Sequence, residues 1–216
     1  HHIKAVFFSL AMASFVTGAL FFVTNNEKFI APFIKPSSKV AAAPFITDGT
    51  AVGPETKVII PKLNLETPII EDSFDPSDEK ATFAALEKGV VLYPDTGLPG
   101  EKDRNPVFFG HSSGNLFNPG VAKFIFVRLH ELQVGDTYAV NYKGKQYVYK
   151  IFNRFVVDKT AVEYLYKTPQ EYSKVAISTL LTCDPPGTDY KRLILQGEQI
   201  SPDPSANVAP TAIQPP

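Results

Sequence analysis

Residues 175–196, VAISTLLTCDPPGTDYKRLILQ, contain the strongest indication of the fold class. Two apolar runs, residues 175–182 and 192–196, have the length and the aliphatic content of buried strands. The sequence DPPG at residues 184–187 lies between them, and this composition is typical of a turn. The segment therefore predicts two strands of one sheet, joined by a short loop.

Further apolar runs of strand length are found throughout residues 55–200, and they outnumber the helix signals. Ser77 is a plausible N-cap for a helix that ends before Gly89, and one helical turn is predicted over residues 168–172. The predicted strands are residues 58–60, 67–70, 90–92 and 106–109, followed by a hairpin of 136–142 with 145–157 around Lys143-Gly144. Mainly β structure is expected, as an all-β barrel or sandwich with one or two short helical insertions.

The composition excludes several classes of protein and of site. The chain has 216 residues, with 21 Lys and Arg against 22 Asp and Glu, so no overall basic field indicates nucleic-acid binding. It contains 1 cysteine, so neither an intrachain disulfide nor a four-cysteine zinc site can form. Its 19 prolines argue against long unbroken helices throughout.

Two proline-rich segments delimit the predicted domain. Residues 25–54 combine four prolines with Ser, Ala and Gly, which predicts an extended linker. Residues 201–216, SPDPSANVAPTAIQPP, predict a disordered tail. The catalytic domain is therefore expected over residues 55–200.

Residues 1–24 are predicted to be an N-terminal membrane anchor. Residues 5–23, AVFFSLAMASFVTGALFFV, are predominantly apolar, and residues 5–26 contain no charge. Roughly twenty such residues cross a bilayer as a helix. A cleaved signal peptide and a buried core helix are the alternatives, although the small residues at 41–43 lie well beyond the apolar run. Lys4 favours a cytoplasmic N-terminus with the domain outside.

The cysteine, Cys183, lies where an apolar strand ends and a loop begins. Arg192 opens the next predicted strand, so the two side chains can approach across a hairpin ladder. A guanidinium there would stabilise the charge that develops on a carbonyl oxygen under thiolate attack. The alternative is a buried structural cysteine beside a surface arginine.

A second candidate group follows the strand at residues 106–109. His111 comes directly after Gly110, and an imidazole is the usual proton carrier near neutral pH. A turn histidine is the alternative, and His130 is interpreted as a surface or packing residue. Residues 110–114 also fit G-x-S-x-G, with Ser112 as the nucleophile of a serine hydrolase. The proline and glycine that follow, and the absence of an acid between Ser112 and His130, argue against it.

Taken together, these motifs resemble those of the sortases, membrane-anchored cysteine transpeptidases of bacterial surfaces. The sequence TLLTC at 179–183 matches their T-L-x-T-C motif, with Arg192 nine residues later. FGHS at 109–112 matches their histidine motif. Weaker similarities cover IPKL at 60–63, GVVLYP at 89–94, LPG at 98–100 and VGD at 134–136. The resemblance implies a closed eight-stranded β-barrel with short helices, preceded by one transmembrane helix.

The resemblance also implies a mechanism and partners. Cys183 would cleave a sorting-signal peptide of the L-P-x-T-G type through a thioacyl-enzyme, which an amine of a cell-wall precursor or a pilin lysine then resolves. His111 would transfer protons, and Arg192 would stabilise the oxyanion. Ser112 and Thr182 are secondary candidates for substrate binding or orientation. A lowered thiol pKa is possible beside an imidazolium and a guanidinium. No cofactor is expected, and the domain would lie outside the cell membrane.

Two alternatives stay open at this point. An acidic cluster could hold Ca²⁺, as in some sortases, although solvated acids at a helix start explain it better: Glu71, Asp72, Asp75, Asp78 and Glu79. The chain could also be a catalytically silent surface module that binds peptide without an acyl-enzyme, against which the presence of Cys183, His111 and Arg192 argues.

Overall fold

The computed structural model describes residues 2–25, 51–71, 75, 77–112, 125–186 and 188–210. The chain divides into two units, His1–Pro36 and Ser37–Pro216. The first contains helix α1, His2–Asn25, so the segment predicted to be a membrane anchor is helical. Among the residues described, no helix qualifies by length and hydropathy as a membrane span, and the predicted anchor is not confirmed.

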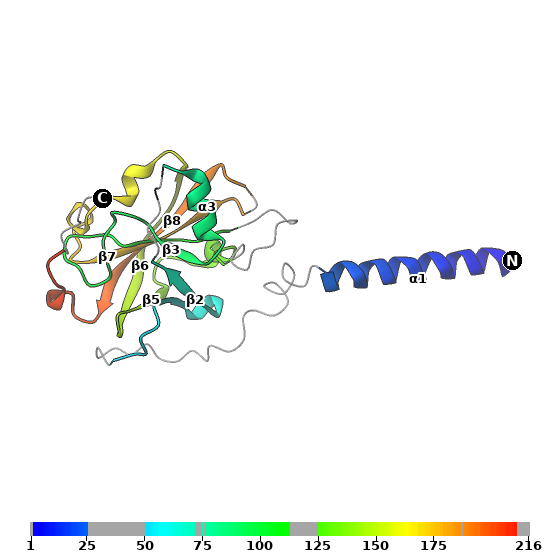
Figure 1. Cartoon of the computed structure of the whole chain (residues 1–216), viewed down its shortest axis with the longest axis horizontal. Coiled ribbons are helices and arrows are strands. Elements are labelled where there is room, and N and C mark those ends of the chain that lie inside the picture. Colours follow the sequence, from blue (N-terminus) through cyan, green and yellow to red (C-terminus); the bar gives the residue numbers. More distant parts are fainter. Residues whose placement is uncertain are drawn as a thin grey trace. The chain divides into compact units, whose positions relative to one another are not determined.

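The second unit is a closed β-barrel (Figure 1). Its strands follow the order β1-β2-β3-β4-β7-β8-β6-β5, and β5 pairs with β1 to close the sheet. The pairs β2–β3 and β4–β7 are parallel, and the other pairs are antiparallel. The strands are β1 (Lys57–Ile60), β2 (Leu65–Ile70), β3 (Val90–Leu92), β4 (Val107–Phe109), β5 (Thr137–Tyr142), β6 (Lys145–Asp158), β7 (Ile177–Asp184) and β8 (Lys191–Ser201).

The fold class expected from the sequence is confirmed for the barrel. Short helical segments connect its strands, as predicted: α3 (Glu79–Leu86), with the 3₁₀ turns η1 (Pro61–Leu63), η2 (Leu129–Glu131), η3 (Val162–Leu165), η4 (Pro169–Tyr172) and η5 (Pro204–Ala206). The predicted N-cap of α3 is wrong by one residue. The carboxylate of Asp78 accepts from the backbone N–H groups of Lys80 and Ala81, whereas Ser77 donates to Asp75.

Two apolar clusters lie on opposite faces of the same strands. Phe108, Leu180 and Leu193 belong to the cluster that fills the barrel. Phe109 and Leu181, each one residue further along its strand, belong to a second cluster with Ala85 and Leu86 of α3 and Leu165 of η3. Because alternate residues of a strand point to opposite faces, this second cluster covers the outside of the barrel. Strand β4 is therefore buried on both faces, which explains its uninterrupted apolar sequence.

The C-terminal residues differ from the disordered tail predicted over 201–216. Strand β8 continues to Ser201, η5 follows, and Val208 forms a bridge with Glu101. The amides of Gln199 and Asn207 are buried and hydrogen-bond to each other. Residues 201–208 thus contact the barrel through these bonds, and residues 211–216 lie outside the described part, as do residues 26–50 of the predicted linker.

Candidate active site

Cys183 and Arg192 are direct partners in the antiparallel ladder between β7 and β8. Side chains of directly opposed residues stand on the same face of a sheet and lie close together. Ile194, two residues after Arg192, belongs to the outer apolar cluster, and Cys183 packs against that cluster. The thiol and the guanidinium therefore share the outer face of the barrel, at the end of β7.

His111 reaches the same end of the sheet from the neighbouring strand. Strand β4 runs parallel to β7 with Phe109 opposite Leu181, and the Gly110 N–H donates to the Leu181 carbonyl at 3.1 Å beyond the last strand residue of β4. His111 and Cys183 each follow these partners by two residues, and the His111 ring stacks on Phe83 of α3, the helix that packs on the outside of the barrel. The three groups singled out in the sequence are therefore carried by β7, by β8 and by the residues that directly follow β4, the strand beside β7.

The position of His111 depends on its small neighbour and on α3. A Cβ at Gly110 would lie 2.6 Å from Cδ2 of Phe126, whose ring is fully buried. Any larger residue at position 110 would therefore displace either the backbone before His111 or the Phe126 ring. The imidazole is 6% exposed and stacks on Phe83 of α3, with ring centroids 5.6 Å apart. These contacts limit how far the imidazole can turn away from β7.

The two secondary candidates have different surroundings. The Thr182 hydroxyl is buried and donates to the Gly110 carbonyl at 2.7 Å, so it joins the cysteine strand to the histidine strand. The Ser112 hydroxyl is buried and has no hydrogen-bond partner among the described residues. No hydrogen bond joins Ser112 to His130 in that part of the chain, since His130 lies against the Val127 carbonyl. The Ser–His pairing required by the serine-hydrolase alternative is thus not seen.

Sequence reasoning missed Asp189, which belongs to the loop between β7 and β8. Its Oδ1 lies 2.8 Å from Nη1 of Arg192 and 3.9 Å from Sγ of Cys183, and its Oδ2 lies 3.1 Å from Nζ of Lys159. Partial burial raises the pKa of Asp189, but the hydrogen bonds and charges of Lys159 and Arg192 outweigh it, and the net pKa is lowered. Asp189 is therefore a carboxylate at neutral pH.

The electrostatic surroundings of the thiol differ from the expectation of a lowered pKa. Burial is the largest influence and raises the pKa of Cys183 above its ordinary value, because the thiolate loses hydration. The charges of Arg192 and Lys159 lower it, while the carboxylate of Asp189 raises it further. The net direction is upward, so the thiol is protonated at neutral pH in the free protein.

Aromatic side chains lie on the same side of the barrel as the guanidinium. Cζ of Arg192 lies 6.0 Å from the centroid of the Phe109 ring, and Tyr93 packs edge-on against Tyr166 at 6.5 Å. Burial and the neighbouring Tyr166 raise the pKa of Tyr93, with Arg192 opposing them. Such surfaces suit a peptide with apolar side chains that places a carbonyl near the cation.

Two carboxylates of the acidic cluster take part in local hydrogen bonds. Asp75 accepts bonds from Ser77 and Asp78 caps α3, while Asp72 lies outside the described residues. Among the residues described, no three His, Cys, Asp or Glu side chains are grouped so as to hold a metal ion.

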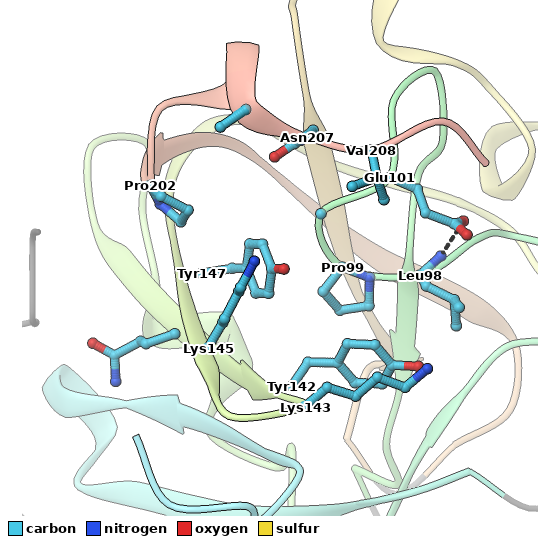
Figure 2. Close-up of a pocket in the computed structure, with 13 residues that line it drawn as sticks. Leu98, Pro99, Glu101, Tyr142, Lys143, Lys145, Tyr147, Pro202, Asn207 and Val208 are labelled. Carbon is cyan, nitrogen blue, oxygen red and sulfur yellow. Dashed lines mark hydrogen bonds between the residues drawn. The ribbon is translucent and has the colours of Figure 1, made fainter. Parts of the chain in front are cut away.

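A cavity of about 330 Å³ lies at the other end of the barrel. Figure 2 shows Tyr142, Lys143 and Lys145 of the β5–β6 hairpin facing Pro99 and the C-terminal segment with Asn207. In the β6–β8 ladder, Val148 pairs with Ser201 near this cavity, whereas Asp158 pairs with Lys191 next to Arg192. The cavity is therefore separate from the Cys–His–Arg group.

Comparisons with known proteins agree with this geometry. A family model described as "Sortase domain" matches residues 58–200. Sortase D of Bacillus subtilis (strain 168) is 28% identical over 142 residues, which cover 66% of this chain and 62% of that protein. The chain thus matches less than two thirds of that relative's length.

Two solved structures share the fold. Sortase C-1 from Actinomyces oris has a TM-score of 0.53 and 24% identity, and the match covers 68% of this chain and 75% of the other. Sortase A from Corynebacterium diphtheriae, a lid mutant, has a TM-score of 0.55 and 23% identity, covering 75% and 76%. At this level of identity the similarity concerns the fold.

Proposed function

Because the chain belongs to the sortase family, whose members are cysteine transpeptidases, we propose that it cleaves a sorting-signal peptide and transfers it to an amine. The observation that supports the proposal is that Cys183 and Arg192 pair directly between β7 and β8, while His111 follows β4, the strand beside β7. Nucleophilic catalysis by a thiol requires a proton carrier and a group that stabilises the oxyanion in this kind of proximity. An L-P-x-T-G type of signal is the proposed substrate.

The reaction is an acyl transfer in two halves. His111 accepts the proton of the Cys183 thiol, the resulting thiolate adds to the peptide carbonyl carbon, and Arg192 stabilises the negative oxygen of the tetrahedral intermediate. The C–N bond then breaks, His111 protonates the leaving amine, and a thioester links the peptide to Cys183. An incoming amine attacks the thioester and His111 accepts its proton. As the amide product leaves, His111 passes this proton to the sulfur, so the thiol is restored.

The protonated state of the free thiol affects the first step. Since the pKa of Cys183 is raised, the thiolate is a small fraction at neutral pH. A bound peptide that excludes Asp189 from the thiol would remove one influence that raises this pKa. Reaction of the free protein with other electrophiles would meanwhile stay slow.

The acceptor and the location of the protein are also proposed. An amine of a cell-wall precursor or a pilin lysine would resolve the thioester outside a bacterial membrane, with residues 5–23 as the anchor. Charge is absent from residues 5–26, and Phe7, Phe15 and Phe21 of α1 are 70%, 74% and 69% exposed. Lipid would bury these side chains favourably. Retention in the membrane fraction after alkaline carbonate washing, and release when Phe15 and Leu20 are both changed to Glu, would support the anchor.

Mass spectrometry with a library of signal peptides tests the proposed activity. A thioester adduct on Cys183 is expected, together with the sequence of the preferred signal. Cys183→Ala should abolish the adduct and the cleavage, and Arg192→Ala should lose most turnover. Full cleavage by either variant would refute the assignment, and binding without an adduct by the unmodified protein would favour the silent peptide-binding module.

A further inference from the structure

Arg192 is a long side chain, so its place beside Cys183 depends on what its guanidinium contacts. Nη1 donates to the Lys191 carbonyl at 3.1 Å and lies 2.8 Å from Oδ1 of Asp189. Within the described residues, no hydrogen bond connects the guanidinium to Sγ of Cys183. The cation is therefore held next to the thiol by a loop carboxylate and a backbone carbonyl of its own strand.

Asp189 is itself held from a second element. Nζ of Lys159, the residue after the end of β6, lies 3.1 Å from Oδ2, the oxygen that does not contact Arg192. Each carboxylate oxygen thus has its own cation, and one oxygen also lies 3.9 Å from the sulfur. Asp189, which contacts both the thiol and the guanidinium, thereby links the loop between β7 and β8 to the end of β6.

We propose that Asp189 is a positioning residue for the transfer reaction: it keeps the Arg192 guanidinium beside the thiol of Cys183 until the peptide carbonyl takes its place. This inference rests on the proposed function. Both members of the pair are partly exposed, with side-chain exposures of 20% for Arg192 and 44% for Asp189. Ion pairs of this exposure are weak, so a developing oxyanion can replace the carboxylate as the partner of the guanidinium.

The same carboxylate influences the charge of the thiol. The charged groups that act on Cys183 are Asp189 and Arg192 of the β7–β8 hairpin and Lys159 after β6, and the titratable His111 follows β4, the strand beside β7. Asp189 is the carboxylate among the groups that act on the thiol pKa, and it raises that pKa. Removing its charge should therefore increase the thiolate fraction at a given pH, whatever happens to the position of Arg192.

Two substitutions separate the two effects. Asp189→Asn removes the charge but keeps an oxygen that can accept from Nη1 of Arg192, whereas Asp189→Ala removes both. Asp203→Asn is the matched control, because it makes the same change of net charge at an exposed cap of η5, where asparagine caps equally well. The purified full chain would be assayed for signal-peptide cleavage and for the pH profile of Cys183 alkylation by iodoacetamide.

Asp189→Ala should lower kcat/KM by about tenfold, mainly through kcat, because a misplaced catalytic group slows the chemical step. Asp189→Asn should stay within about threefold of the unmodified protein, and both variants should shift the alkylation midpoint to lower pH. The inference would be overturned if folded Asp189→Ala kept its kcat/KM, or if both variants lost kcat/KM equally. An unchanged pH profile of Cys183 alkylation would overturn it as well.

The proposed function and this inference fail in distinguishable ways. Retained cleavage by Cys183→Ala would remove the function itself, since no other thiol is available in the chain. An inactive Cys183→Ala together with normal kinetics of Asp189→Ala would leave the function intact and remove only the role of Asp189. A melting curve for each variant identifies loss of folding, and the alkylation profile of Asp189→Asn remains informative if Asp189→Ala does not fold.

Discussion

Replacing Thr182 by valine tests the hydrogen bond that joins the cysteine strand to the histidine strand. Thr182 is buried, with 2% of its surface exposed, and its hydroxyl donates a hydrogen bond to the Gly110 carbonyl at 2.7 Å. Valine has nearly the same shape, so the change removes this bond with little change in packing. Loss of a partner in a buried bond costs about 1–3 kcal/mol. In a domain of this size each kcal/mol lowers Tm by roughly 2–4 °C, so a decrease on the order of 5 °C is expected.

The assay compares Thr182→Val with Thr182→Ser, which keeps the hydroxyl and loses the methyl group. Urea unfolding gives the change in free energy, and peptide cleavage gives kcat and KM. Thr182→Val should unfold at lower urea and lose kcat more than KM, because Gly110 precedes His111 and a shift of this backbone moves the imidazole. If Thr182→Val matches the unmodified protein while Thr182→Ser is the less stable variant, the reasoning is refuted.

Two further predictions concern the thiol and Gly110. Because the pKa of Cys183 is raised from 9.0, alkylation by iodoacetamide should be slow at pH 7 and should still increase above pH 9; a plateau already reached at pH 7 would contradict the burial argument. Gly110→Ala places a Cβ 2.6 Å from the Phe126 ring and should destabilise the domain by about 1–3 kcal/mol in urea unfolding. Gly53→Ala, where nothing lies within 4 Å of the added Cβ, should leave stability unchanged, and equal effects of the two would contradict the packing explanation.

Local sequence patterns were sufficient for most strands of the barrel. The hairpin predicted around Lys143-Gly144 is present, and both residues have positive φ, 47° and 75°, as the turn between β5 and β6 requires. The prediction that Cys183 and Arg192 approach across a ladder agrees with their direct pairing, because a short loop strongly restricts the register of a hairpin. These features depend on residues close together in the chain.

Features that depend on distant residues could not be read in the same way. The parallel pairing of β4 with β7 joins segments about seventy residues apart in the sequence. The residues alone therefore indicated two separate candidate groups, Cys183 with Arg192 and His111, and only the resemblance to a family brought them together. The raised pKa of Cys183 follows from burial and from Asp189, and neither the depth of the thiol nor the direction of that side chain is encoded in the TLLTC motif. Phe83, which stacks on His111, likewise belongs to a helix with no local signal of its contact.

The contacts around the thiol differ in how strongly the sheet constrains them. Cys183 and Arg192 take their places from a backbone ladder, and His111 follows a strand of the same sheet, so a surface substitution does not shift them. Asp189 and Lys159 lie outside those ladders, and the ion pair between them is largely exposed, with side-chain exposures of 44% and 50%. Salt screens exposed ion pairs more than buried ones, so ionic strength should change the reactivity of the thiol without changing the register of the strands. We therefore infer that Asp189 adjusts the pKa of the thiol, whereas the residues that the sheet positions carry out the chemistry.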